Sequence, residues 1–209
     1  SAGGTVIATG QWNALVANTA SAAAHSGSSI TSVTAPTSGG TVTYLSAIPT
    51  NLTTIYTNRR NASTVGSTAT STATRGTSWQ NAITFTHTVT FASGDAARYF
   101  FNAGGQIKMT ASHPTGSGIN LLFSDLASNT GTVVQSAPNS GTVSIAGTAY
   151  SGITKVGGGG TTPTIGTNEG YFGLTTSNAT AFTQTASSGP SGYLSSFIRY
   201  IVKSNGTQG

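Results

Sequence analysis

The sequence has no cysteine and few charged side chains among its 209 residues. Without cysteine there can be no disulfide bond, no cysteine-ligated zinc and no thiol catalysis. Asp, Glu, Lys and Arg together make up 5% of the residues, against about 25% in ordinary soluble domains. Packing, or association with other chains, must therefore hold the fold together.

Titratable groups that could do chemistry are equally scarce. The acidic residues and histidines are Asp95, Asp125, Glu169, His25, His87 and His113. General acid–base catalysis needs such groups close together, and a two-carboxylate glycan hydrolase would use most of the acids in the chain. We therefore expect that the chain is not an enzyme, and that it has no catalytic residue, cofactor or metal site. His87 lies between Phe85 and Val89 in an alternating pattern, which favours a hydrogen-bonded core histidine over a metal ligand.

The charged residues that are present are mostly basic, and the net charge is +5. They are dispersed, with Arg59-Arg60 as the one adjacent pair, so we expect no nucleic-acid partner. No apolar run approaches the roughly 18 residues that a membrane helix needs, and Ser1–Gly4 lacks the features of a signal peptide. We therefore expect no membrane association. A surface of Ser, Thr, Asn, Gln and Gly has little like-charge repulsion, which permits close association of identical chains.

Two helices are predicted near the N-terminus. In residues 11–24, apolar residues recur at spacings of three and four, and Thr9 is the predicted N-cap. Residues 44–60 predict a second helix that becomes regular near 46–49, because Pro49 is tolerated only at a helix start. We interpret residues 1–60 as a helical docking segment, or alternatively as helices that pack on a sheet. Residues 61–80 predict a Ser/Thr-rich linker or loop.

The remainder, residues 81–209, predicts a β-rich domain. Ile83, Phe85, His87, Val89 and Phe91 alternate with threonines, which is the period of a strand. Further predicted strands are 98–101, 106–112, 142–145, 150–156, 171–175, 181–185 and 193–203, with turns at 93–95 and 102–105 and a short helix near 119–126. The predicted fold is mainly β, an antiparallel sandwich or jelly-roll-like domain preceded by short N-terminal helices.

Several apolar side chains are candidates for packing or assembly: Trp12, Tyr99, Phe100, Phe101, Phe197 and Ile201. If 98–101 is a strand, its aromatic residues face both sides of a sheet. The predicted C-terminal strand also has apolar residues on both faces. A two-layer domain covers only one face of an outer sheet, so we expect a second copy to cover the other. Trp79, Tyr150, Tyr171 and Phe172 could stack on sugars, but core packing is the favoured interpretation of each.

The segment His87–Met109 reads HTVTFASGDAARYFFNAGGQIKM. It resembles a stretch in virion structural proteins of tailed bacteriophages, especially tail-fibre-like proteins of marine and cyanobacterial phages. The shared pattern is a Thr-rich strand, an acid in a turn, Ala-Arg-Tyr-Phe-Phe-Asn, then Gly-Gly and another strand. The helix that begins Gln11-Trp12-Asn13 agrees more loosely, and the resemblance implies no catalytic residue.

The resemblance implies a structural component of a tailed-phage virion, associated with the tail, fibre or baseplate and assembled in the host cytoplasm. The expected partners are copies of the chain itself, with a homotrimer favoured, and other virion structural proteins. A head-decoration or neck protein is one alternative. Another is a lectin-like receptor-binding module whose partner is a host surface glycan.

Overall fold

The computed structural model describes residues 8–34, 46–59, 69–77, 81–145 and 147–206. Within these ranges 33% of the residues are helical and 20% are in strands. The strands form small antiparallel sheets. The predicted mainly β sandwich or jelly-roll-like fold is therefore wrong, and the chain mixes α and β structure.

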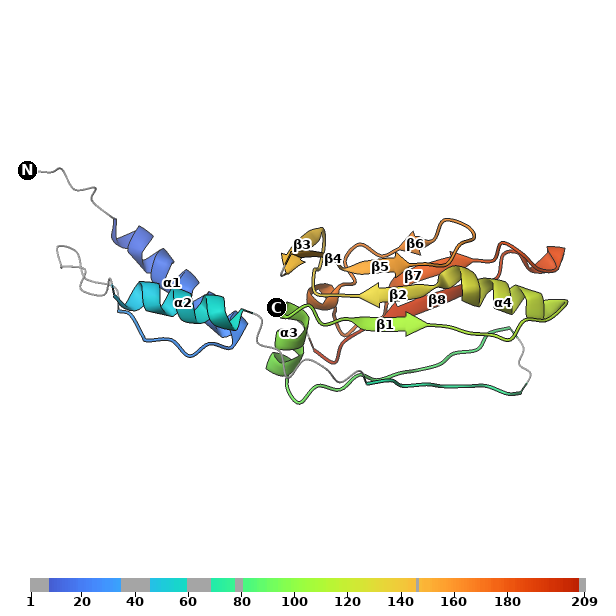
Figure 1. Cartoon of the computed structure of the whole chain (residues 1–209), viewed down its shortest axis with the longest axis horizontal. Coiled ribbons are helices and arrows are strands. Elements are labelled where there is room, and N and C mark those ends of the chain that lie inside the picture. Colours follow the sequence, from blue (N-terminus) through green and yellow to red (C-terminus); the bar gives the residue numbers. More distant parts are fainter. Residues whose placement is uncertain (1–7, 35–45, 60–68, 78–80, 146, 207–209) are drawn as a thin grey trace, which may run out of the picture.

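The elements lie along an elongated molecule (Figure 1). The helices are α1 (Thr9–Ser26), α2 (Ala47–Asn58), α3 (Gly94–Asn102) and α4 (Ile119–Thr130). The strands are β1 (Ile107–Thr110), β2 (Thr132–Gln135), β3 (Thr142–Ile145), β4 (Thr148–Ser151), β5 (Ile153–Val156), β6 (Thr164–Ile165), β7 (Ala179–Thr185) and β8 (Phe197–Val202). Two short 3-10 turns span Tyr171–Gly173 and Ser191–Tyr193. The pair α1 and α2 occupies one end, the sheets and α4 extend to the other, and α3 lies between them.

Helices α1 and α2 confirm the two helices predicted near the N-terminus. They pack against each other, and Trp12 and Ala23 of α1 and Ile48 of α2 are buried. The buried Asn51 side chain bonds to both backbone groups of Thr31, at 2.8 and 3.0 Å. The predicted Thr9 cap is wrong, because the N-cap is Ala8, whose N–H donates to the side chain of Gln11.

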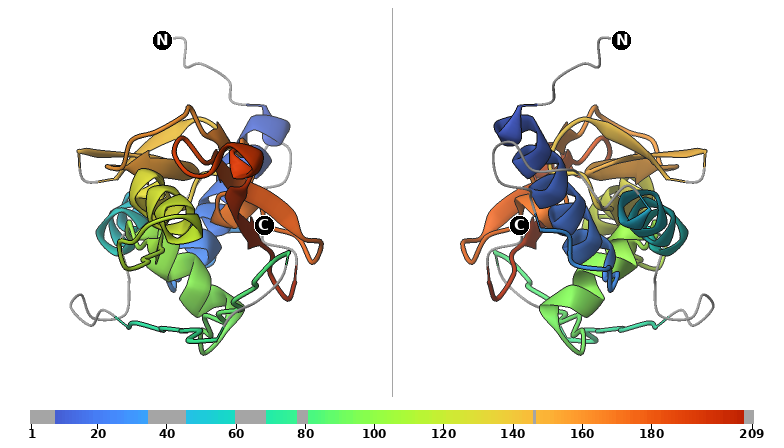
Figure 2. Two further views of the ribbon diagram at one scale, coloured as in Figure 1. Left: turned by 90° about the vertical axis from the view of Figure 1, so that its right-hand side faces the viewer. Right: turned by 90° about the vertical axis from the view of Figure 1, so that its left-hand side faces the viewer.

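Two three-stranded antiparallel sheets form the larger end of the molecule, with strand orders β1-β2-β5 and β6-β7-β8. They meet through a buried cluster of Val133, Ile153, Ala181 and Phe182. Helix α4 packs its buried leucines against Ala186 and the start of β8. The hairpin β3-β4 is separate from both sheets. The end-on views in Figure 2 show these elements gathered around the long axis.

The segment predicted as the strand 98–101 is helical instead. Ser93 is the N-cap of α3, and its hydroxyl oxygen accepts a hydrogen bond from the N–H of Ala96 at 3.0 Å. Asp95 lies in the first turn, where a negative charge stabilises the helix dipole. Of the three successive strands predicted at 83–91, 98–101 and 106–112, only the third is present, as β1, and the other two predictions are wrong.

The other predicted elements are present in part. The helix near 119–126 and the strands at 142–145 and 181–185 are confirmed as α4, β3 and β7. The predicted strand 150–156 is divided into β4 and β5, and the C-terminal strand begins only at Phe197. Tyr171–Gly173 forms a 3-10 turn in place of a strand. Residues 69–77 carry no helix or strand, which agrees with the predicted loop.

The nine-residue alternating pattern at 83–91 does not form a strand of any sheet within the described residues. Its backbone is extended and runs beside the sheets together with residues 69–77 (Figure 1). We call residues 82–91 the extended arm. Among the described helices, none is long and apolar enough to cross a membrane.

Candidate assembly surface

The six predicted packing or assembly residues fall into two groups. Trp12 and Phe101 are buried, with 6% and 1% of their surfaces exposed. Tyr99 and Phe100 are half-buried on α3. Phe197 and Ile201 are 51% and 54% exposed on β8. The chain itself therefore packs the first four, and the last two remain available to a partner.

The aromatic residues of α3 form a cluster inside the chain. The ring of Phe101 stacks on Tyr171 with centroids 4.2 Å apart, and Phe100 contacts Phe101 edge-on at 5.1 Å. Phe91, at the end of the extended arm, lies 5.3 Å from Phe100. Burial raises the pKa of Tyr171. The sequence predicted that Tyr99, Phe100 and Phe101 lie on the two faces of a strand, with a second copy covering one face. That prediction is wrong, because the three residues lie on a helix.

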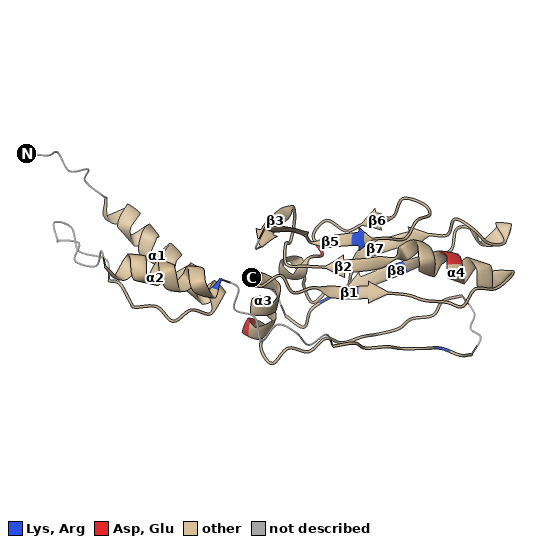
Figure 3. Cartoon of the chain, in the orientation of Figure 1, with Lys and Arg blue, Asp and Glu red and all other residues tan. Residues whose placement is uncertain are grey.

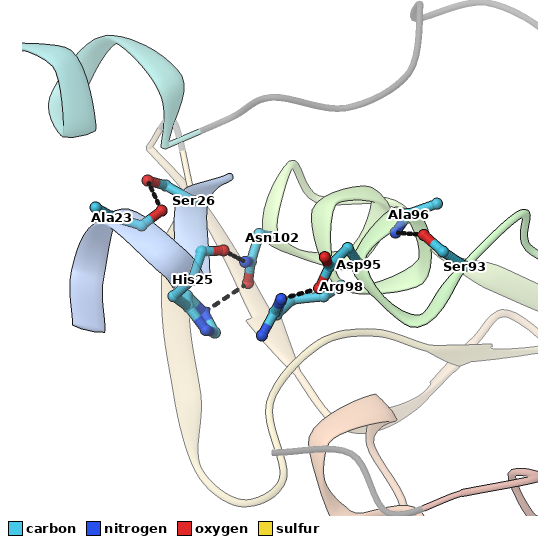
Figure 4. Close-up of polar contacts among 8 residues, drawn as sticks. All are labelled: Ala23, His25, Ser26, Ser93, Asp95, Ala96, Arg98 and Asn102. Carbon is cyan, nitrogen blue, oxygen red and sulfur yellow. Dashed lines mark hydrogen bonds and ion pairs between the residues drawn. The ribbon is translucent and has the colours of Figure 1, made fainter. Parts of the chain in front are cut away.

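Helix α3 also holds the helical pair against the sheets. Nε2 of His25 lies 3.1 Å from Oδ1 of Asn102, and Nδ2 of Asn102 donates to the carbonyl of His25 at 3.1 Å (Figure 4). A Cβ at Gly27, which ends α1 with a φ of 64°, would overlap the ring of Tyr99. These contacts join α1 to α3 by polar bonds and close packing.

The exposed side of β8 forms a continuous surface with its neighbour β7. Ile198, Tyr200 and Val202 point toward the buried clusters. The residues between them are exposed, and the antiparallel register places threonines of β7 beside them. We call this surface the outer β8 face; its residues are Thr180, Thr183, Thr185, Phe197, Arg199 and Ile201.

The outer β8 face is apolar and hydroxylated, with Arg199 as its charged member. The Arg199 guanidinium carbon lies 4.5 Å from the ring centre of Phe197, so the cation packs on an aromatic face. On the opposite side of the strand, burial raises the pKa of Tyr200 to about 12. The face therefore presents two large apolar side chains, threonine methyls and hydroxyls, and a single positive charge.

The three carboxylates lie apart, Asp95 on α3, Asp125 on α4 and Glu169 in the loop before Tyr171–Gly173 (Figure 3). Asp95 pairs with Arg98 on α3, and Glu169 accepts the N–H of Asn168 at 2.8 Å. Asp125 on α4 accepts hydrogen bonds from the N–H and hydroxyl of Ser187, at 2.7 and 2.9 Å. In the part of the chain that the structure describes, no group of three His, Asp or Glu side chains is arranged to hold a metal ion.

The surroundings of Asp125 lower its pKa. Partial burial acts to raise the pKa, but the hydrogen bonds from Ser187, Ser188 and Asn129 outweigh it and hold the pKa below 3.8. The geometry is that of a carboxylate that ties the end of β7 to α4, since Asn129 also donates to Ser187 at 2.9 Å.

His87 is not a core histidine, and that prediction is wrong. Its side chain is exposed on the extended arm, with Nδ1 2.9 Å from the hydroxyl of Ser71. Phe85 and Val89 on either side are 46% and 55% exposed. The middle of the arm therefore displays two apolar side chains to solvent, whereas Ile83 and Phe91 at its ends are half-buried.

The aromatic residues proposed for sugar stacking are used in packing where they are described. Tyr171 is buried in the aromatic cluster and Phe172 packs against it. Tyr150 is half-buried with its hydroxyl near Gly104. Core packing is thus confirmed for Tyr171 and Phe172, Tyr150 lies outside the buried clusters, and Trp79 lies outside the described residues.

A shallow hollow of about 420 Å³ lies where the helical pair meets the hairpin β3-β4. His25, Asn102 and Phe172 line it beside apolar residues of the hairpin. Because His25 and Asn102 are bonded to each other, the polar lining is already engaged in holding α1 to α3.

Sequence reasoning found Phe197 and Ile201 but missed the threonines of β7 that complete the outer β8 face. The alternation in Ala179–Thr185 was the available signal, since it sends Thr183 and Thr185 to the side opposite Phe182 and Gln184. No protein-family model, curated protein or solved structure matches the chain.

Proposed function

We propose that this chain is a non-enzymatic structural component of a tailed-phage virion, associated with the tail, fibre or baseplate. It works as an assembly of identical copies, for which a trimer is the favoured state. The observation that carries the proposal is the outer β8 face, where Phe197 and Ile201 are both more than half exposed.

An exposed apolar face of this kind favours association. Contiguous apolar surface on a soluble chain commonly marks a site for a partner. Burial of the outer β8 face by a neighbouring copy would cover few charges, because the threonines of β7 are neutral and Arg199 is the charged residue on the face. A polar, weakly charged surface can therefore be buried without the desolvation of many ions.

The virion assignment is supported by the resemblance of His87–Met109 to phage structural proteins. In this chain the segment supplies Phe91, Phe100 and Phe101 to the aromatic cluster and Asn102 to the link with α1. The similar residues are thus those that join the helical end to the sheets. The elongated form, with helices α1 and α2 at one end (Figure 1), suits a subunit that docks by that end.

The test is mass spectrometry with copy-number counting on purified particles of the encoding phage, combined with antibody labelling in the electron microscope. The expected result is the chain in a multiple of three copies, with label on the tail, fibre or baseplate. Label on the head or neck would favour the decoration or neck alternative. Absence of the chain from particles would overturn the proposal.

A further inference from the structure

The extended arm is a strand by its sequence but has no strand partner in the structure. Its apolar residues alternate with four threonines, and its backbone is extended. Among the described residues, none of its backbone N–H or C=O groups bonds to another backbone group. Phe85 and Val89 are about as exposed as Phe197 and Ile201.

Such a segment is suited to completing a sheet elsewhere. Backbone N–H and C=O groups are strong bonding groups that find partners when they are buried. An extended segment supplies a whole row of them, and the common way to use that row is addition to the free edge of a sheet. Residues 82–91 contain no Lys, Arg, Asp or Glu. Charged side chains on an exposed strand disfavour its pairing with another strand, and the arm has none of them.

The best acceptor edge in the chain is β8. Within the described sheets, every strand except β2 and β7 is an edge strand, and β3 and β4 of the hairpin have four residues each. Strand β6 has two residues, and β1 and β5 have four each. Strand β8 has six, and its described backbone pairing is with β7 alone. It is therefore the longest open edge, and the outer β8 face lies directly beside it.

We propose that the extended arm of one copy adds to the free edge of β8 in a second copy. The spacing fits, because Phe85 and Val89 are four residues apart, as are Phe197 and Ile201. Side chains on one face of a strand recur every second residue. The two exposed apolar pairs therefore come side by side and bury each other. In this register His87 lies opposite Arg199 whether the strands run parallel or antiparallel.

The occupant is a second copy because this chain itself supplies both parts of the contact, the unpaired arm and the open edge of β8, and within one chain the described residues of the two are not paired with each other. Donation from each copy to the next is a head-to-tail contact, which closes into a ring when the rotation allows. This inference rests on the self-association in the proposed function, and a ring of three is the state that the two proposals share.

The absence of cysteine makes the contact directly testable. Two single-cysteine variants, tagged His87→Cys and untagged Arg199→Cys, are co-expressed, oxidised mildly and separated without reductant. Directly opposite residues on paired strands have Cβ atoms about 4.5–5.5 Å apart, close to the spacing that a disulfide needs. The expected product is a covalent pair of one tagged and one untagged chain. The matched control pairs Thr88→Cys with Arg199→Cys. The side chain at position 88 points to the opposite face of the arm from that at position 87, so the covalent pair is not expected to form.

Hydrogen exchange on the unsubstituted protein gives an independent measurement, with slow exchange expected for amides of residues 82–91 in the assembly. A single-chain mass at micromolar concentration would refute self-association and the arm contact together. An oligomer with neither the 87–199 product nor slow exchange would refute the arm contact alone. A product between two His87→Cys chains would overturn β8 as the acceptor. A third variant carries both cysteines in one chain. If its disulfide forms only within that chain, the arm pairs with its own β8 and the proposal that a second copy is the acceptor is overturned.

Discussion

Among single residues, Phe101 connects two separate parts of the molecule. Its buried ring stacks on Tyr171 and contacts Phe100, so it joins α3 to the 3-10 turn that precedes β7. We expect Phe101→Ala to lower the free energy of unfolding by about 3–5 kcal/mol, because it leaves a cavity that the surrounding helices and turns cannot fill. Denaturant unfolding followed by circular dichroism measures the change.

The matched control is Phe197→Ala, which removes the same ring from an exposed position. An exposed substitution changes the stability of the separate chain by about 0.5 kcal/mol or less. Measurement at several protein concentrations separates chain stability from association. Equal losses for the two variants would contradict the burial of Phe101.

Asp125 makes folding sensitive to acid. A carboxylate with a lowered pKa in the folded state adds stability above its unfolded value, near 3.8, and loses it as pH falls through the folded value. We expect Asp125→Asn to be about 1 kcal/mol less stable than the unsubstituted chain at neutral pH. The difference should shrink below pH 3.8. Unfolding curves from pH 7 to pH 2 test this, and a difference that is constant across the range would contradict it.

For elements, the contact between α1 and α3 depends on a glycine. Gly27 adopts a left-handed conformation and lies against the ring of Tyr99. We expect Gly27→Ala to destabilise this contact by at least about 1–2 kcal/mol, from the backbone conformation alone. Hydrogen exchange should become faster in α1 while the sheets keep their protection.

Gly10→Ala is the matched control in the same helix, because a Cβ there meets nothing within 4 Å. Alanine is the better helix former, so α1 should exchange no faster than before. Faster exchange in this control as well would mean that α1 responds to any substitution, and that the contact between Gly27 and Tyr99 has no specific role in stabilising it.

Helix α3 shows why the fold class could not be predicted from local pattern alone. Tyr99, Phe100 and Phe101 have high strand propensity, and that propensity drove the prediction of a strand. The opposing signals were present in the same segment: Ser93 as a cap, Asp95 in the first turn and two alanines after it. The cap stabilises the start of the helix, and the i, i+4 spacing of Ala97 and Phe101 lets both side chains be buried. Together these contributions outweigh the strand propensity of the aromatic residues.

The extended arm shows a different limit. Period two at 83–91 predicted a strand, and that prediction is wrong, because the segment pairs with no described strand although its course is drawn out (Figure 1). The pattern specifies which side chains share a face, but it does not specify which strand lies alongside. Pairing depends on contacts that are distant in sequence or on another chain, and a local pattern holds no information on either.

For the whole molecule, the proposed function predicts an assembly larger than one 20.8 kDa chain at micromolar concentration. Obligate interfaces commonly bury more than about 2,000 Å², and a charge placed within one is costly. We expect Phe197→Asp or Ile201→Asp to reduce the mass to that of one chain. Light scattering after size exclusion measures it.

Val156→Asp is the matched control, because Val156 is 60% exposed on β5, outside the outer β8 face. Its mass should equal that of the unsubstituted protein. Dissociation by all three substitutions would show that added charge, and not its position, disrupts the assembly. A single-chain mass for the unsubstituted protein would contradict self-association itself.

The helical pair lies at one end of the long axis and α4 extends toward the other (Figure 1). Copies related by a cyclic rotation about an axis near that direction all point the same way. In the proposed assembly, such a ring would have two different rims. One rim would carry helices α1 and α2, with Leu52 and Tyr56 exposed on α2, and the opposite rim would carry the far end of α4. A neighbour that binds one rim would find no equivalent surface on the other, so the ring would enter a larger particle in one direction only.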